Sequence, residues 1–150
     1  MEQTIKKIVC KNDLFFKDVE EILKEGKRVK ITVRGDSMNP VLKDGDIVVL
    51  EKGHLPNEKK GDIVFAKHEG KYILHRVMWM SANTLCLAGD GNKLQVEKVR
   101  KDHVLAVVSG AFRGEEYLSL DFSGSSVQWF GRCLSGFFWY IGNRIKKRYL

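Results

Sequence analysis

Residues 29–40 read VKITVRGDSMNP, a strand pattern that leads into a sharp turn with a serine near its tip. Apolar and polar residues alternate from Val29 to Arg34, which is typical of a half-buried β-strand. Gly35 then permits a backbone conformation that a Cβ atom disfavours, and Pro40 stops a regular continuation. A serine on such a turn projects its hydroxyl beside backbone N–H groups, which suits a nucleophile that must stabilise an oxyanion. The same residue types are common in ordinary loops, so the turn by itself leaves both interpretations open.

The chain continues this β pattern to about residue 120. Short apolar runs alternate with turn residues, and Gly-Asp pairs stand at several of the turns. The runs lie at 47–50, 63–66, 72–74, 84–87, 104–108 and 117–120. Many short strands separated by turns predict a mainly β, antiparallel domain. In front of them, residues 12–25 place apolar side chains on one face and charged ones elsewhere, which predicts one amphipathic packing helix.

Length and composition favour a globular domain that needs no disulfide or metal. A chain of 150 residues can bury a core of its own, and an apolar fraction of 43% is ordinary for globular proteins. Cys10, Cys86 and Cys133 are odd in number and form no CxxC pair. We therefore expect three packed thiols rather than a disulfide framework or a zinc site, and we expect no metal and no organic cofactor.

The last part of the chain differs in composition from the β region. A joint of serine and glycine begins at residue 123, and residues 127–148 are aromatic and then basic. This pattern predicts an amphipathic helix that either lies on an anionic membrane surface or docks on the β body. We expect two parts, a β domain over 1–122 and a joint with a C-terminal helix over 123–150.

The excess positive charge is concentrated in the C-terminal part of the chain and does not indicate a nucleic-acid partner. The net charge is +7, with four basic residues among the last seven, while the rest of the chain is nearly balanced. A nucleic-acid interface would need a basic patch on the folded body or a known module, and the sequence shows neither. Because the first residues lack the apolar run of an export signal, we expect a cytoplasmic protein, either free or peripheral at the inner membrane face.

The serine turn is followed by four further motifs in a fixed order. They are Lys43-Asp44-Gly45-Asp46 and Lys60-Gly61-Asp62, each before a strand, then Leu74-His75-Arg76-Val77, and then Gly89-Asp90-Gly91-Asn92. This order resembles the signal peptidase I superfamily, which also includes the self-cleaving SOS-repressor-type peptidases. The resemblance covers about residues 29–108. It implies the antiparallel β fold of that superfamily and a hydrolase activity, that of a serine protease of the histidine-base type.

The resemblance also implies roles for individual residues. Ser37 matches the nucleophile. His75 occupies the general-base position, where bacterial signal peptidases have lysine and the archaeal and endoplasmic-reticulum types have histidine. Asp90 matches the acidic residue of the Gly-Asp-x-Asn turn and is the expected partner of the base. Met38 matches the residue that packs beneath the nucleophile.

Gly35 and Asp36 complete the expected turn. Signal peptidases often have a serine where this chain has Gly35, and its hydroxyl helps to hold the oxyanion, whereas repressor-type members have glycine. The oxyanion would then depend on backbone N–H groups, that of Ser37 among them. Asp36 adjoins the serine and is expected to shape the turn.

The expected function is therefore cleavage of a peptide or protein substrate by a serine endopeptidase, through an acyl-enzyme at Ser37. A serine hydroxyl needs a base to remove its proton, and an imidazole titrates near the working pH. A non-catalytic module on the same fold, binding peptides or a membrane-bound partner, is the alternative.

Overall fold

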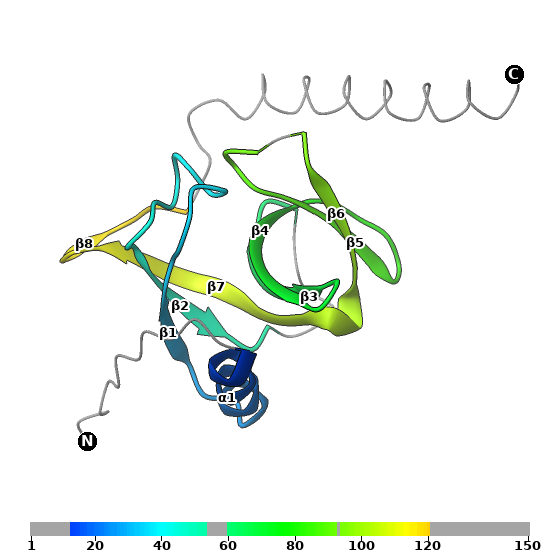
Figure 1. Cartoon of the computed structure of the whole chain (residues 1–150), viewed down its shortest axis with the longest axis horizontal. Coiled ribbons are helices and arrows are strands. Elements are labelled where there is room, and N and C mark those ends of the chain that lie inside the picture. The colour runs from blue at the N-terminus through cyan, green and yellow to red at the C-terminus, as the bar shows by residue number, and fades with distance from the viewer. Residues whose placement is uncertain (1–12, 54–59, 93, 121–150) are drawn as a thin grey trace, which may run out of the picture. The chain divides into compact units, whose positions relative to one another are not determined.

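The mainly β fold is confirmed by the computed structural model, which describes residues 13–53, 60–92 and 94–120 (Figure 1). The described chain opens with the helix α1 (Asp13–Lys24), which the amphipathic pattern predicted. The strands are β1 (Val29–Thr32), β2 (Ile47–Glu51), β3 (Ile63–His68), β4 (Lys71–Met80), β5 (Thr84–Ala88), β6 (Val96–Arg100), β7 (Val104–Arg113) and β8 (Glu116–Tyr117), with a 3₁₀ turn at Lys101–His103.

All strand pairs in the described sheet are antiparallel. The strand order is β1-β2-β7-β3-β4-β5-β6, and β8 pairs with β7. The sheet curls into a half-barrel in which β3 to β6 form the tightest part of the curve (Figure 1). This curling brings β6 back near β3, although the two strands are far apart in the strand order.

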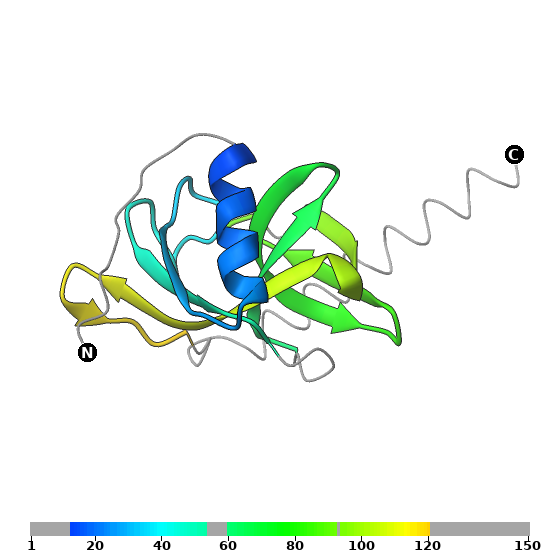
Figure 2. The ribbon, with the colours of Figure 1, turned by 90° about the horizontal axis from the view of Figure 1, so that it is seen from below.

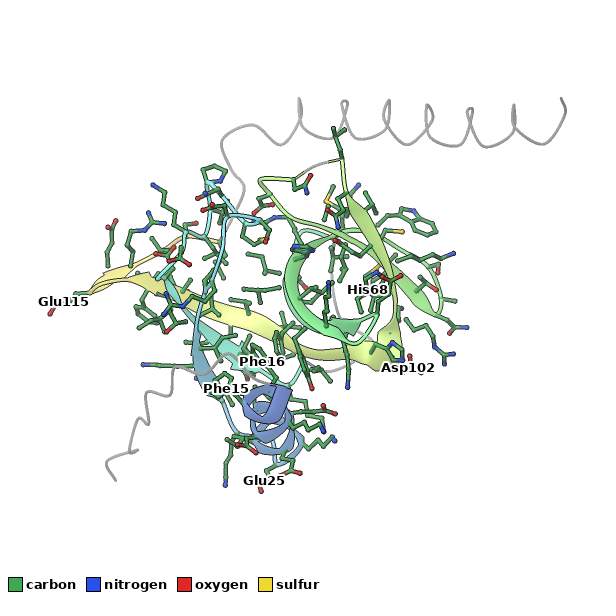
Figure 3. All side chains as sticks on the ribbon, in the orientation of Figure 1. Phe15, Phe16, Glu25, His68, Asp102 and Glu115 are labelled. Carbon is green, nitrogen blue, oxygen red and sulfur yellow. The ribbon has the colours of Figure 1, made fainter. Side chains whose placement is uncertain are left out.

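The buried side chains form two clusters. One lies between α1 and the strands β1, β2 and β7, and the other lies inside the curl of β3 to β6. Strand β3 contributes to both, because Ile63 and Phe65 join the first cluster while Val64 and Ala66 join the second. Figure 2 shows α1 across one face of the sheet, and Figure 3 shows Phe16 projecting from it toward the strands. The Phe16 ring lies 4.8 Å from that of Tyr72 and 5.6 Å from that of Phe65, which fixes the helix to β3 and β4.

The sequence prediction missed one strand and placed several strand ends wrongly. Strand β6 was not expected, β4 continues to Met80, and β7 continues to Arg113. The expected strand at 117–120 overlaps the two-residue strand β8 only at Tyr117. The omission of β6 matters most, because this strand carries a residue of the candidate site.

The predicted joint and C-terminal helix at 123–150, with the membrane-facing residues 127–148, lie outside the described residues. The contacts of the chain divide it into two units, Met1–Leu120 and Asp121–Leu150. In the described parts of the chain, no helix is long and apolar enough to cross a bilayer.

Candidate active site

The serine turn follows directly from the end of β1. After Thr32, the Val33 N–H donates to the Asp46 carbonyl at 2.7 Å, and the Gly45 N–H donates to the Val33 carbonyl at 2.9 Å. Gly35 then adopts φ +87°, a left-handed conformation that glycine accepts without a Cβ penalty. Its N–H donates to Oδ1 of Asp44 at 2.9 Å, so the turn is anchored on the loop that leads into β2.

Ser37 is exposed at the tip of this turn, and Met38 is buried beneath it with 1% of its surface exposed. Asp36 makes two contacts within the turn, since its carbonyl accepts from the Asn39 N–H at 3.1 Å and its carboxylate from the Asn39 amide at 3.2 Å. The serine is therefore open to an incoming polypeptide while its backbone is fixed from below.

A second turn lies against the serine turn and admits no side chain at the contact. The Gly91 N–H donates to the Ser37 carbonyl at 2.8 Å. A Cβ atom on Gly89 would lie 2.3 Å from the Ser37 carbonyl oxygen and 3.3 Å from Nε2 of His75. The Ser37 backbone and the His75 ring therefore flank the same glycine. The structure thus brings together two residues that lie 38 positions apart in the sequence.

The carboxylate that contacts His75 is Glu97 of β6. Nδ1 of His75 lies 2.9 Å from Oε2 of Glu97, and the two side chains are only 12% and 8% exposed. An ionised carboxylate can only accept, so this contact places a proton on Nδ1 and leaves Nε2, on the side of the serine turn, to act as acceptor. Glu97 was missed by the sequence analysis.

Asp90, the partner of His75 expected from the sequence, makes a different contact. Its two carboxylate oxygens accept from Nε and Nη2 of Arg76, each at 2.8 Å. His75 and Arg76 are consecutive in β4 and therefore point to opposite faces of the sheet. The Asp90 carboxylate lies on the Arg76 face, so the expected contact between Asp90 and His75 is wrong, and the carboxylate in contact with His75 is that of Glu97.

The register of the sheet explains why Glu97 can reach His75. Val77 of β4 pairs with Leu87 of β5, which pairs with Glu97 of β6. Val77 and Leu87 face the inside of the curl, and His75 is two residues before Val77 on the same face of β4. The imidazole of His75 and the carboxylate of Glu97 therefore lie close together at one end of the inner face of the curl.

Backbone groups are available for an oxyanion at the serine turn. Within the described residues, the N–H groups of Ser37 and Met38 donate no hydrogen bond. Gly35 offers no side-chain donor, as the sequence indicated. A direct hydrogen bond between the Ser37 hydroxyl and His75 is also absent from the contacts of the described residues. Catalytic hydrogen bonds often tighten only when substrate binds.

Other titratable groups of the described chain are not suited to this chemistry. Burial raises the pKa of the Cys86 thiol, which opposes a role as a nucleophile. Burial acts to raise the pKa of Asp46, but the hydrogen bonds from Arg113 and from the Lys43 N–H outweigh it and lower that pKa below its ordinary value. Among the described residues, no group of three or more His, Cys, Asp or Glu side chains could hold a metal ion.

The exposed serine turn, the histidine beside it and the curled antiparallel sheet that joins them define the class of the protein as a serine-peptidase-type β fold. Residues 3–111 match the family described as Peptidase S24-like. The chain belongs to the Peptidase S24-like family, within the wider superfamily of signal peptidases and repressor-type peptidases. No curated protein matches the chain significantly.

Proposed function

We propose that the chain is a serine endopeptidase of signal-peptidase type in which Ser37 is the nucleophile and His75 the base. One observation carries this proposal. The Ser37 carbonyl and Nε2 of His75 both lie against Gly89, while Nδ1 of His75 is held by Glu97. Ser37, His75 and Glu97 therefore lie in the order nucleophile, base and orienting carboxylate. This is the order that activates a serine hydroxyl in a catalytic triad.

Acylation would use both nitrogens of His75. Nε2 removes the proton from the Ser37 hydroxyl as its oxygen attacks the scissile carbonyl carbon, and the Glu97 carboxylate stabilises the imidazolium that forms. The oxyanion accepts from backbone N–H groups at the turn, that of Ser37 first. When the C–N bond breaks, His75 returns the proton to the leaving amine, and the acyl group remains on Ser37.

Deacylation would repeat these steps with water as the nucleophile. His75 takes a proton from the water, which attacks the ester carbonyl, and the proton then returns to Ser37 as the acid product leaves. The turn has glycine where a side-chain donor could stand, and a missing oxyanion donor is worth about 3 kcal/mol of transition-state stabilisation. We therefore expect slow turnover.

The substrate would bind as an extended strand along β4. Residues 71–75 of β4 pair with β3 on one side, whereas pairing with β5 begins only at Arg76. In the described sheet, the other edge of residues 71–75 is thus unpaired, and it ends at His75. A peptide strand on this edge would gain backbone hydrogen bonds and bring its carbonyl to the serine turn.

The direct test is labelling by a fluorophosphonate probe and mass spectrometry of a peptide mixture after incubation. Ser37→Ala is expected to abolish both labelling and cleavage. Ser109→Ala, which removes an exposed serine on β7, should leave both unchanged. His75→Gln should abolish activity while His103→Gln, at the exposed 3₁₀ turn, should not. Labelling that persists in Ser37→Ala would contradict the nucleophile assignment.

A binding module without catalysis is the second candidate, and the missing hydrogen bond between the Ser37 hydroxyl and His75 favours it. In that case the wild-type protein would bind extended peptides but would neither react with the probe nor cleave. Binding would then be the same in wild type and in Ser37→Ala.

A further inference from the structure

We infer that Arg76 and Asp90 are positioning residues for Ser37. Their buried ion pair fixes the Gly89-Asp90-Gly91 turn, and that turn fixes the backbone of the nucleophile relative to the strand that carries the base. This inference depends on the proposed function for its catalytic consequence, but its structural part can be tested separately.

The ion pair is a rigid reference point. Arg76 is 3% exposed and Asp90 is 1% exposed, and their two hydrogen bonds form a bidentate contact. The Nη1 atom of the same guanidinium donates to the Gly61 carbonyl at 2.6 Å and to the Leu120 carbonyl at 3.3 Å. A buried charge is costly without its partner, so the pair holds Asp90 at one place and orientation.

The turn transmits this position to the serine through its backbone. Gly91, the residue after Asp90, donates the hydrogen bond to the Ser37 carbonyl. A Cβ atom on Gly91 would lie 2.7 Å from the Asp36 carbonyl oxygen, so the two backbones are already in close contact. A displacement of Asp90 would therefore move the serine turn, because no flexible side chain lies between the two backbones to absorb it.

The base belongs to the same strand as the reference point. His75 and Arg76 are adjacent in β4, one facing the inner face of the curl and the other facing Asp90. Strand β4 thus positions both sides of the site. It carries His75 directly, and it positions Ser37 through the contacts of Arg76, Asp90 and Gly91. Misplacing reacting groups by about 1 Å can cost about 10²-fold in rate.

Asp90 and Glu97 would then act on different properties of the reaction. Glu97 contacts the imidazole and influences its proton, whereas Asp90 influences the distance between the serine and the imidazole. A change at Asp90 should slow the reaction and also loosen the Gly91 hydrogen bond to the Ser37 carbonyl. A change at Glu97 should slow the reaction but leave that hydrogen bond intact, because Glu97 contacts only the imidazole side of the site.

The experiment measures the rate of probe labelling, together with hydrogen–deuterium exchange of the Gly91 amide, in wild type, Asp90→Asn and Glu97→Gln. Asp90→Asn is expected to slow labelling at least about tenfold, by the same misplacement argument. It should also speed exchange of the Gly91 amide, which Glu97→Gln should leave unchanged. Wild-type labelling and exchange rates in folded Asp90→Asn would overturn the inference.

Gly91→Ala provides a second variant in case Asp90→Asn does not fold. It leaves the ion pair intact but inserts a Cβ atom against the Asp36 carbonyl, so it should also slow labelling. Normal labelling in this variant would contradict the coupling. If the wild-type protein does not label at all, the proposed peptidase activity fails, and the exchange of the Gly91 amide still decides whether Asp90 holds the turn.

Discussion

Nδ1 of His75 lies 2.9 Å from Oε2 of Glu97, and the contact joins the middle of β4 to the edge strand β6 across the inside of the curl. Both side chains are largely buried, so water competes little for this hydrogen bond. The pair fixes which imidazole nitrogen carries the proton, and in the proposed mechanism this leaves the other nitrogen to accept a proton from Ser37.

Replacing Glu97 by glutamine should therefore reduce activity strongly while the protein stays folded. The amide has nearly the shape of the carboxylate but no charge to stabilise an imidazolium. We expect the rate of probe labelling to fall by about 10²–10⁴-fold, as in serine triads that lose their acid. Glu116→Gln, on the exposed strand β8, is the matched control and should label at the wild-type rate. Equal rates in the two variants would remove Glu97 from the site.

Gly89→Ala should disrupt the site by sterics alone. The new methyl group would lie 2.3 Å from the Ser37 carbonyl oxygen and 3.3 Å from Nε2 of His75, so the backbone of the serine turn has to move. We expect labelling to fall about 10²-fold by misplacement and the unfolding free energy to fall by about 1–3 kcal/mol from overpacking.

Gly70→Ala is the control for this variant. Gly70 has φ +76° in the hairpin between β3 and β4, and a Cβ atom there would meet no neighbour within 4 Å. It should lower the unfolding free energy through backbone strain but leave labelling unchanged. A similar loss of labelling in both alanine variants would indicate general destabilisation rather than a steric block at Ser37.

Most of the sheet could be predicted because its strands follow simple local patterns. The segments at 29–34, 47–50, 63–66 and 84–87 all contain strands of the structure, since apolar runs bounded by turns leave few other options. Strand β6 departs from the usual pattern of buried apolar and exposed charged residues. Val96 is 52% exposed on its outer side, whereas Glu97 is 7% exposed on its inner side, so the alternation of VEKVR does not stand out.

The candidate site shows the same division between local and long-range information. The turn around Ser37 could be predicted from its glycine, asparagine and proline, because turn chemistry is local. The contact of Glu97 with His75 depends on the register of three neighbouring strands, which no local pattern specifies. Asp90 was assigned to His75 because it belongs to a conspicuous turn, but its carboxylate contacts Arg76, which points to the opposite face of β4 from His75.

Acid should weaken the fold partly through Asp46. Its folded pKa lies below the ordinary value of 3.8, because Arg113 donates to both carboxylate oxygens and Lys43 donates its N–H, which together outweigh the effect of burial. A lowered pKa means that this contribution is present above the unfolded value and is lost as the pH falls through the folded one. Urea unfolding should thus show a decrease in stability that begins near pH 3.8 and continues below it.

Arg113→Met should remove most of this acid-dependent contribution. Arg113 is 40% exposed, so solvent screening of its guanidinium should keep the loss of stability at neutral pH small. Asp44→Asn, which changes an exposed carboxylate on the neighbouring loop, should have a smaller effect. If Arg113→Met and wild type lost stability in parallel below pH 3.8, Asp46 would not be the group responsible.

Tyr72→Phe should leave the fold unchanged in stability or make it more stable, although tyrosine is usually the better residue at a partly polar site. The Tyr72 hydroxyl is buried, and among the described residues it has no hydrogen-bond partner. Its ring packs between Phe16 of α1 and Phe65 of β3, and phenylalanine keeps both contacts. Removing an unsatisfied buried hydroxyl should raise the unfolding free energy by up to about 1 kcal/mol. Tyr117→Phe, 61% exposed, should show no change, and a loss of stability in Tyr72→Phe alone would mean that the hydroxyl has a partner in solution.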